Sequence, residues 1–285
     1  MVATLSGLAG GVIAWRWARR AGAPRTEAAV ARSRWVQRLD PQAATGLALT
    51  LAFAVIVLGG LVLAVLAYVV RGKGDVVRID SAAADWGDRN ASGFATDVLT
   101  GISHMGEPKV VIALAVLVAI AETARTRSRW VIPFMALVVA GNGIITTTVK
   151  ELADRARPTL NPIAETLGPS FPSGHSSWSA AFAAATALLA TRGRSRRARA
   201  LIVGACTAAA TSIAATRVLL DVHWLSDVIA GLAVGSAWFC VCAIAFGGRL
   251  LRFGAPAEQA EREHASSVAA GAGGGVSPPP TRLRP

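Results

Sequence analysis

The sequence predicts an all-α, polytopic membrane protein with six transmembrane helices and both termini in the cytoplasm. Three observations lead to this prediction: the composition, the lengths of the apolar runs and the charges of the segments between them. Of the 285 residues, 53% are hydrophobic and only 16% are charged, and the mean hydropathy is +0.48. A soluble domain carries about 25% charged residues, so this chain has too few charges to cover a water-facing surface. The composition also excludes a disordered chain, a disulfide scaffold and a collagen-like rod.

Six runs with few or no charged residues are long enough, or nearly long enough, to cross a bilayer. A spanning helix needs about 17–25 residues. We therefore expect helices at Thr45–Val70, Val110–Ala124, Trp130–Val149, Ser176–Thr191, Ala200–Thr216 and Val228–Gly248. The second and fourth runs are short, so their helices are expected to include flanking residues such as Gly106–Lys109 and Gly174–His175. Glu122, near the end of the second run, is expected to reach the interface.

The charges of the connecting segments alternate and predict the orientation. Arginines cluster before the first helix and after the second, fourth and sixth: seven in Arg16–Asp40, three in Arg125–Arg129, five in Arg192–Arg199, then Arg249 and Arg252. The segment Arg71–Lys109 instead balances five basic residues against six acidic ones. Because basic loops stay in the cytoplasm, both termini are expected there. The net charge of +12 therefore indicates topology and not a nucleic acid partner.

Three regions follow from this pattern. Residues 1–44 form a basic cytoplasmic segment, residues 45–250 form the six-helix membrane domain, and residues 251–285 form a disordered cytoplasmic tail rich in glycine and proline. Met1–Trp15 is apolar but would span only about 22 Å as a helix, so an interfacial or poorly ordered helix is expected there. The three cysteines lie inside apolar runs and are interpreted as small filler residues.

Charged residues also gather on the predicted outer side, in three patches that the topology argument did not use. In the first patch, Lys150 and Arg157 lie seven residues apart, which is two helical turns. They share a face and can grip one anion. Two ordinary cations that snorkel to the interface are the alternative interpretation.

The second patch, Ser173-Gly174-His175, opens the fourth helix. Free backbone N–H groups and the helix dipole favour a phosphate at such a position. A serine that simply caps the helix is the alternative.

The third patch contains His223 and Asp227, four residues apart. The carboxylate can hold one imidazole nitrogen and leave the other free as a nucleophile or base. The alternative is a pair that merely caps the sixth helix. Arg217 lies six residues before His223, off the same face of a continuous helix, so we expect a break near Leu220-Asp221.

The other two histidines are not expected to be catalytic, and the sequence predicts no metal site. His104 is interpreted as a structural or rim residue, and His264 lies in the tail. No Cys, His and carboxylate cluster has metal-ligand spacing, so no metal and no cofactor are expected. Three cations, two histidines and one carboxylate suit metal-free phosphoryl transfer, in which cations bind the anion, one histidine attacks and the other protonates the leaving group.

The three patches, in this order, resemble the signature motifs of the type 2 phosphatidic acid phosphatase family. The matching residues are Lys150, Arg157 and Pro158, then Pro172, Ser173, Gly174 and His175, then Arg217, His223 and Asp227. Thr216 stands where the family usually has serine, and it keeps the hydroxyl. The motifs cover Lys150–Asp227, and the six-helix topology extends the resemblance to about Thr45–Gly248.

The resemblance implies a six-helix phosphatase of the cell membrane, with its active site on the extracytoplasmic face and no metal. It implies that His223 becomes a phosphohistidine oriented by Asp227, and that His175 is the general acid. It implies phosphate binding by Lys150, Arg157, Ser173, Gly174 and Arg217. The implied substrates are lipid phosphates and diphosphates of the phosphatidic acid, phosphatidylglycerol phosphate or undecaprenyl pyrophosphate type.

Two other classes of protein are alternatives. Vanadium-dependent haloperoxidases carry the same motifs, but they are largely soluble, which the six apolar runs disfavour. A non-catalytic transporter or lipid-binding protein would explain the helices but not a complete catalytic set. Phosphate release from a lipid phosphate in detergent distinguishes these classes. The sequence does not indicate the oligomeric state.

Overall fold

The computed structural model describes residues 41–247 except 71, 73–74, 90–92 and 159–167. Within these ranges every regular element is a helix, which confirms the all-α class. The helices are α3 (Pro41–Val69), α4 (Asp75–Arg89), α5 (Gly93–His104), α6 (Pro108–Thr126), α7 (Val131–Ala153), α8 (Gly174–Ala190), α9 (Arg196–Leu219) and α10 (Leu225–Phe246). Six of them occupy the six predicted runs, and α4 and α5 lie in the segment after the first run. The expectations for Met1–Trp15, for the remaining residues up to 40 and for the tail at 251–285 fall outside the described residues.

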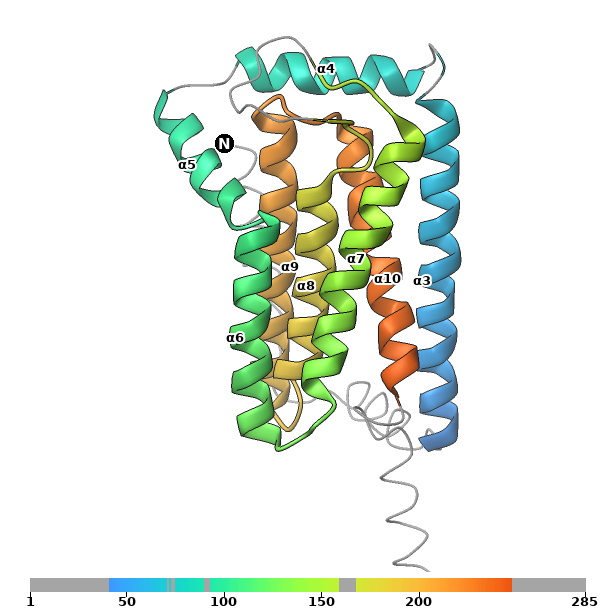
Figure 1. Cartoon of the computed structure of the whole chain (residues 1–285), viewed down its shortest axis with the longest axis vertical. Coiled ribbons are helices and arrows are strands. Elements are labelled where there is room, and N and C mark those ends of the chain that lie inside the picture. Colours follow the sequence, from blue (N-terminus) through green and yellow to red (C-terminus); the bar gives the residue numbers. More distant parts are fainter. Residues whose placement is uncertain (1–40, 71, 73–74, 90–92, 159–167, 248–285) are drawn as a thin grey trace, which may run out of the picture.

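The six long helices stand side by side as a bundle, and α4 lies across one end of it (Figure 1). We call this end the site end. α5 slants along the edge of the bundle and meets α6 at a bend of 52°. α3 begins and α10 finishes at the opposite end (Figure 1), so the first and last described helices have these ends on the same side of the bundle. Which side is cytoplasmic stays a prediction from the arginine clusters.

Among the described residues, four helices are long and apolar enough to cross a membrane by themselves: α3 from Gly46, then α7, α9 and α10. The bent pair of α5 and α6 makes a fifth candidate if it counts as one span. α8 has 17 residues, or about 25 Å, which is less than the ~30 Å hydrocarbon core. The chain is therefore a multi-pass membrane protein with four or five candidate spans in its described part, and the sixth span stays a prediction.

Close packing between α8 and α10 depends on two glycines one turn apart. A Cβ on Gly231 would lie 2.4 Å from the carbonyl oxygen of Ser173, and a Cβ on Gly235 would lie 2.3 Å from that of Ser177. Any larger residue would force the helices apart, so this small-xxx-small pattern lets the two backbones touch. The contact brings the beginning of α10 against the beginning of α8.

Hydrogen bonds between side chains join α7 to α8 in the middle of the bundle. Thr146 donates to the Ser177 hydroxyl at 3.1 Å, and Ser177 donates to the Asn142 side-chain oxygen at 2.7 Å. All three side chains are buried. Interhelical polar contacts of this kind stabilise helix pairs inside a membrane, where water cannot satisfy the same groups.

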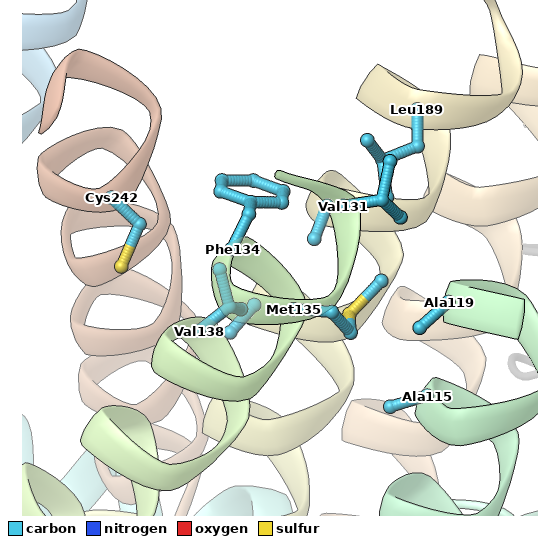
Figure 2. Close-up of a cluster of buried hydrophobic side chains, with 10 residues drawn as sticks. Ala115, Ala119, Val131, Phe134, Met135, Val138, Leu189 and Cys242 are labelled. Carbon is cyan, nitrogen blue, oxygen red and sulfur yellow. The ribbon is translucent and has the colours of Figure 1, made fainter. Parts of the chain in front are cut away.

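A hydrophobic cluster fills the half of the bundle away from the site end. Figure 2 shows Phe134, Met135 and Val138 of α7 among residues of the neighbouring helices, with Cys242 of α10 on one side and Ala115 of α6 on the other. The rings of Phe134 and Phe246 pack edge to face, with centroids 5.7 Å apart. This cluster holds the lower ends of the helices together.

Glu122, which was expected to reach the membrane interface, has an ion-pair partner inside the protein. Its side chain is buried and paired with Arg125 of the same helix. Arg125 also donates to the carbonyl oxygens of Leu189 and Arg192 at 3.0 and 3.1 Å. The charge is thus satisfied inside the protein, where it ties the end of α6 to the end of α8.

Candidate active site

The ends of four helices meet beneath α4 at the site end. α7 and α9 finish there, α8 and α10 begin there, and Figure 1 shows α8 beginning deeper in the bundle than α7 and α9 end. All eight predicted site residues lie on these ends or in the links that join them: Lys150, Arg157, Ser173, Gly174, His175, Arg217, His223 and Asp227. Residues up to 77 positions apart in the chain are thus collected in one place.

His223 and Asp227 form a buried pair. Nδ1 of His223 lies 3.3 Å from Oδ2 of Asp227, and the two residues are 2% and 0% exposed. The same carboxylate oxygen accepts the Trp224 backbone N–H at 3.0 Å, so Asp227 also caps α10. Asp227 thus contacts the imidazole and caps the helix, and the catalytic role of the pair stays a prediction. Because an ionised carboxylate only accepts hydrogen bonds, the Nδ1 proton points at Asp227 and Nε2 carries the lone pair.

Nε2 of His223 faces the guanidinium group of Arg157. An Nη atom of Arg157 lies 3.1 Å from it and also donates to the Val222 carbonyl oxygen at 2.8 Å. Burial lowers the pKa of His223 to about 4, and the positive charges of Arg157 and Arg217 act in the same direction, while Asp227 opposes them. Burial likewise lowers the pKa of Arg157. At neutral pH the imidazole is therefore uncharged, and its Nε2 lone pair points at the Arg157 guanidinium group.

Lys150 and Arg157 converge on one acceptor. Lys150 Nζ donates to the Pro169 carbonyl oxygen at 2.6 Å, and Arg157 donates to the same oxygen at 3.3 Å. α7 ends at Ala153, and Asp154 takes a left-handed conformation that turns the chain back toward the bundle. The two cations therefore meet through this turn and not along one helix face, as their spacing of seven had suggested. They can nevertheless donate to a single anion.

Ser173 occupies the N-cap position of α8 but does not cap it with its side chain. Its hydroxyl oxygen accepts from Ser176 at 3.0 Å, and its backbone N–H donates to the Asp227 carbonyl oxygen at 2.9 Å. The first-turn N–H groups of a helix have no carbonyl partner in the preceding turn. A Cβ on Gly174 would meet Lys150 Cε at 3.9 Å, so this helix end lies beside the lysine.

Arg217 lies at the end of α9, 4% exposed, and donates to the hydroxyl of Ser103 on α5. Its Nε is buried and has no hydrogen-bond partner among the described residues. The expected break follows at once: α9 ends at Leu219, and Asp221 has a φ of +54°. The backbone N–H of His223 then donates to the Arg217 carbonyl oxygen at 3.1 Å, so the break places the two motif residues side by side.

His175 lies in the first turn of α8 and packs against the bend between α5 and α6. A Cβ on Gly106 would lie 3.1 Å from Cδ2 of His175, so the backbone at this bend directly contacts the imidazole. His104 lies nearby in sequence, but its side chain is 63% exposed and bonds to Glu107. The structure thus places His104 on the rim, as predicted.

Three contacts of Arg155 were missed by the sequence interpretation. Arg155 bonds to Asp227, donates to Ser226 at 2.8 Å and forms an ion pair with Asp80 of α4 at 2.8 Å. Trp224 lies over its guanidinium group at 5.4 Å. The sequence offered one signal, a third cation inside the run from Lys150 to Arg157, but nothing in it indicates that Asp80 is its partner.

Within the described ranges, no group of three or more His, Cys, Asp or Glu side chains is arranged to hold a metal ion. This observation concerns metal binding by the described residues and does not test the reaction, so metal-independent catalysis stays a prediction.

Comparison with known proteins gives two kinds of match. Residues 132–250 match the PAP2 superfamily, and this range contains all eight predicted site residues. Phosphatidylglycerophosphatase B of Bacillus subtilis is 28% identical over 151 residues, which is 51% of this chain and 72% of that protein. Lipid A 1-phosphatases of Rhizobium johnstonii and Rhizobium etli are each 35% identical over 133 residues, or 41% of this chain. The match covers 50% and 53% of those two proteins, about half of their length.

The fold is also similar to that of a solved structure. The crystal structure of the first transmembrane PAP2 type phosphatidylglycerolphosphate phosphatase from Bacillus subtilis has a TM-score of 0.63 and 21% identity. The similarity covers 67% of this chain and 94% of that chain. At this level of identity the likeness shows a shared fold.

Proposed function

The chain belongs to the PAP2 superfamily, and we propose that it is a membrane lipid phosphatase that acts through a phosphohistidine intermediate. The observation that carries this proposal is the arrangement of the His223 ring. One nitrogen is held by Asp227 at 3.3 Å, and the other lies 3.1 Å from the Arg157 guanidinium group. A nucleophilic nitrogen beside a phosphate-binding cation is what attack on a phosphoryl group requires.

In the proposed first step, Nε2 of His223 attacks phosphorus, a P–N bond forms and the bond to the leaving oxygen breaks. Asp227 stabilises the imidazolium that results, because its carboxylate already accepts the Nδ1 proton. His175 donates a proton to the leaving oxygen. In the second step water attacks the phosphohistidine, His175 takes a proton from that water, and inorganic phosphate and free His223 are released.

The phosphoryl oxygens are proposed to bind to the cations and to the beginning of α8. Lys150 and Arg157 already reach one shared acceptor, the Pro169 carbonyl oxygen. Arg217 offers a buried Nε without a partner in the described part of the chain. Ser173 and Gly174 supply the helix N-terminus, where the dipole and the free N–H groups favour an anion. Such donors stabilise the charge that develops in the transition state.

The proposed substrates are lipid phosphates and diphosphates, and the proposed site faces the extracytoplasmic side. The names of the relatives support two headgroup classes, a phosphatidylglycerol phosphate and a lipid A 1-phosphate. Sidedness rests on the arginine clusters. It is tested with single cysteines in a cysteine-free background: Asp97→Cys should react with an impermeant maleimide in intact cells, and Arg197→Cys should not. The opposite labelling pattern would invert the proposed orientation.

The activity is tested by phosphate release from purified protein in detergent. A panel of phosphatidic acid, phosphatidylglycerol phosphate, a lipid A 1-phosphate and undecaprenyl pyrophosphate should give release from at least one member. EDTA should leave the rate unchanged, and vanadate should inhibit, because it resembles the pentacoordinate transition state of phosphoryl transfer. The His223→Ala variant is the control for contaminating phosphatases. Lipid binding without release, by a protein with an intact fold, would support a non-catalytic lipid-binding protein instead.

A further inference from the structure

Arg155 lies between two buried carboxylates that come from different parts of the chain. Asp80 of α4 is 1% exposed and Asp227 of α10 is 0% exposed. One guanidinium nitrogen donates to Asp80 Oδ2 at 2.8 Å, and the other bonds to Asp227 Oδ1. The Arg155 side chain is itself only 12% exposed, so the ion pairs are shielded from water.

Ser226, the residue before Asp227 in the chain, contacts both Asp80 and Arg155. Its backbone N–H and its hydroxyl donate to the two oxygens of Asp80 at 2.8 and 2.6 Å, and its hydroxyl oxygen accepts from Arg155 at 2.8 Å. Both oxygens of each carboxylate and the Ser226 hydroxyl thus have a partner. The cluster anchors α4 to the first turn of α10, next to the His223 pair.

The two oxygens of Asp227 have separate tasks. Oδ1 bonds to Arg155, whereas Oδ2 accepts from Trp224 N–H and faces Nδ1 of His223. Trp224 reinforces the arrangement, since its ring lies over Arg155 and its Nε1 donates to the Ala156 carbonyl oxygen at 3.0 Å. Arg155 therefore holds one oxygen of the carboxylate whose other oxygen faces the imidazole.

Charge gives Arg155 a second role. Two like charges that are buried near each other need a counter-ion, because water does not screen them there. The other groups that act on Asp227 are His223 and the more distant cations Lys150 and Arg157. Of these, none contacts Asp80 in the described structure, and Arg155 is the cation that touches both carboxylates.

We propose that Arg155 is a positioning residue for catalysis: as the shared counter-ion of Asp80 and Asp227, it keeps the Asp227 carboxylate aimed at His223. The inference rests on the proposed function, because it assigns Arg155 an effect on His223 as the nucleophile. It also makes α4 part of the active site, through Asp80, although α4 carries no motif residue.

The test is a double-mutant cycle that measures single-turnover phosphoenzyme formation at pH 7. Arg155→Gln should slow phosphoenzyme formation by about tenfold or more. Adding Asp80→Asn removes the second carboxylate that Arg155 neutralises, so it should recover part of the rate. Arg78→Gln is the matched control, since Arg78 lies on α4 and is exposed at 83%.

A second double-mutant cycle, which pairs Arg155→Gln with Asp227→Asn, distinguishes a positioning role of Arg155 from a role in the fold alone. In the Asp227→Asn background, Arg155→Gln should cost less than about threefold, because its target is already gone. Losses that simply multiply would overturn the inference, as would an Arg155→Gln enzyme with the rate of the wild type. Arg155→Lys keeps the charge, so it should lose less of the rate than Arg155→Gln, and it replaces Arg155→Gln in the cycle if the glutamine variant does not fold.

The two proposals fail in different ways. A wild-type protein that forms no phosphoenzyme with any lipid phosphate would overturn the proposed function and this inference together. An active wild type whose Arg155 and Asp227 variants lose activity independently would overturn this inference alone.

Discussion

The backbone N–H of Ser173 donates to the backbone carbonyl oxygen of Asp227 at 2.9 Å. This bond joins the beginning of α8, which carries the predicted phosphate-binding turn, to the first turn of α10, which carries the aspartate that holds His223. It forms because Gly231 and Gly235 let the two helix backbones touch. The distance between His223, the proposed nucleophile, and the proposed phosphate-binding turn is therefore determined by helix packing below the site.

Gly231→Ala should lower both the melting temperature and the activity. Its Cβ would lie 2.4 Å from the Ser173 carbonyl oxygen and 2.9 Å from the Ser176 Cβ, so α8 and α10 must separate. Overpacking of this kind costs about 1–3 kcal/mol. Gly60→Ala is the matched control, because a Cβ there meets nothing within 4 Å and alanine favours the helix. Equal melting temperatures and rates for the two variants would contradict the packing argument.

His223→Ala should reduce turnover below about one thousandth of the wild-type rate and abolish the phosphoenzyme, because the attacking nitrogen is lost. Asp227→Asn should cost less, about 10- to 100-fold, because the nucleophile remains and only its orientation and stabilisation suffer. Phosphoenzyme formation is measured by quenched single-turnover labelling. Retention of more than about one percent of activity by the alanine variant would remove His223 as the nucleophile.

His223 should stay uncharged well below neutral pH. Burial lowers its pKa to about 4 from the ordinary value of 6.5, so lowering the pH from 7 to 5 should leave the ring neutral. Asp227 raises this pKa, so Asp227→Asn should lower it further and extend the neutral range. The measurement is nitrogen NMR of histidine-labelled protein in lipid nanodiscs, with the signal assigned by its loss in His223→Gln. A midpoint at or above 6.5 would show that burial does not control this imidazole.

The role of His175 can be tested through the leaving group. An alkoxide that leaves a lipid monophosphate needs a proton, whereas a phosphate that leaves a lipid diphosphate has a second pKa of about 6 and needs less help. His175→Asn should therefore slow phosphoenzyme formation from phosphatidic acid more than from a prenyl diphosphate. His223→Ala should damage both reactions equally. Equal losses in the His175 variant would mean that His175 mainly binds phosphate.

The sequence predicted the helical class and the positions of the six long helices because these depend on local properties. An uncharged run forms a helix in lipid wherever it stands, since the backbone must satisfy its own hydrogen bonds there. The break after Arg217 was also predictable, because the spacing to His223 did not fit one helix face. The sequence also predicted that Lys150 and Arg157 lie close together, but it assumed one continuous helix. In the structure the helix ends at Ala153, and a turn at Asp154 brings the two side chains together.

By itself, the sequence determined which residue types could do phosphoryl chemistry and in what order they stand along the chain. Only the tertiary structure decided how they are connected. The contacts of Arg155 with Asp80 and Asp227 span 75 and 72 positions, and no periodicity relates residues that far apart. They meet because α4 lies across the end of the bundle, over the place where α7 ends and α10 begins. Such a contact depends on how whole helices pack, and buried charges become partners only once that packing has removed them from water.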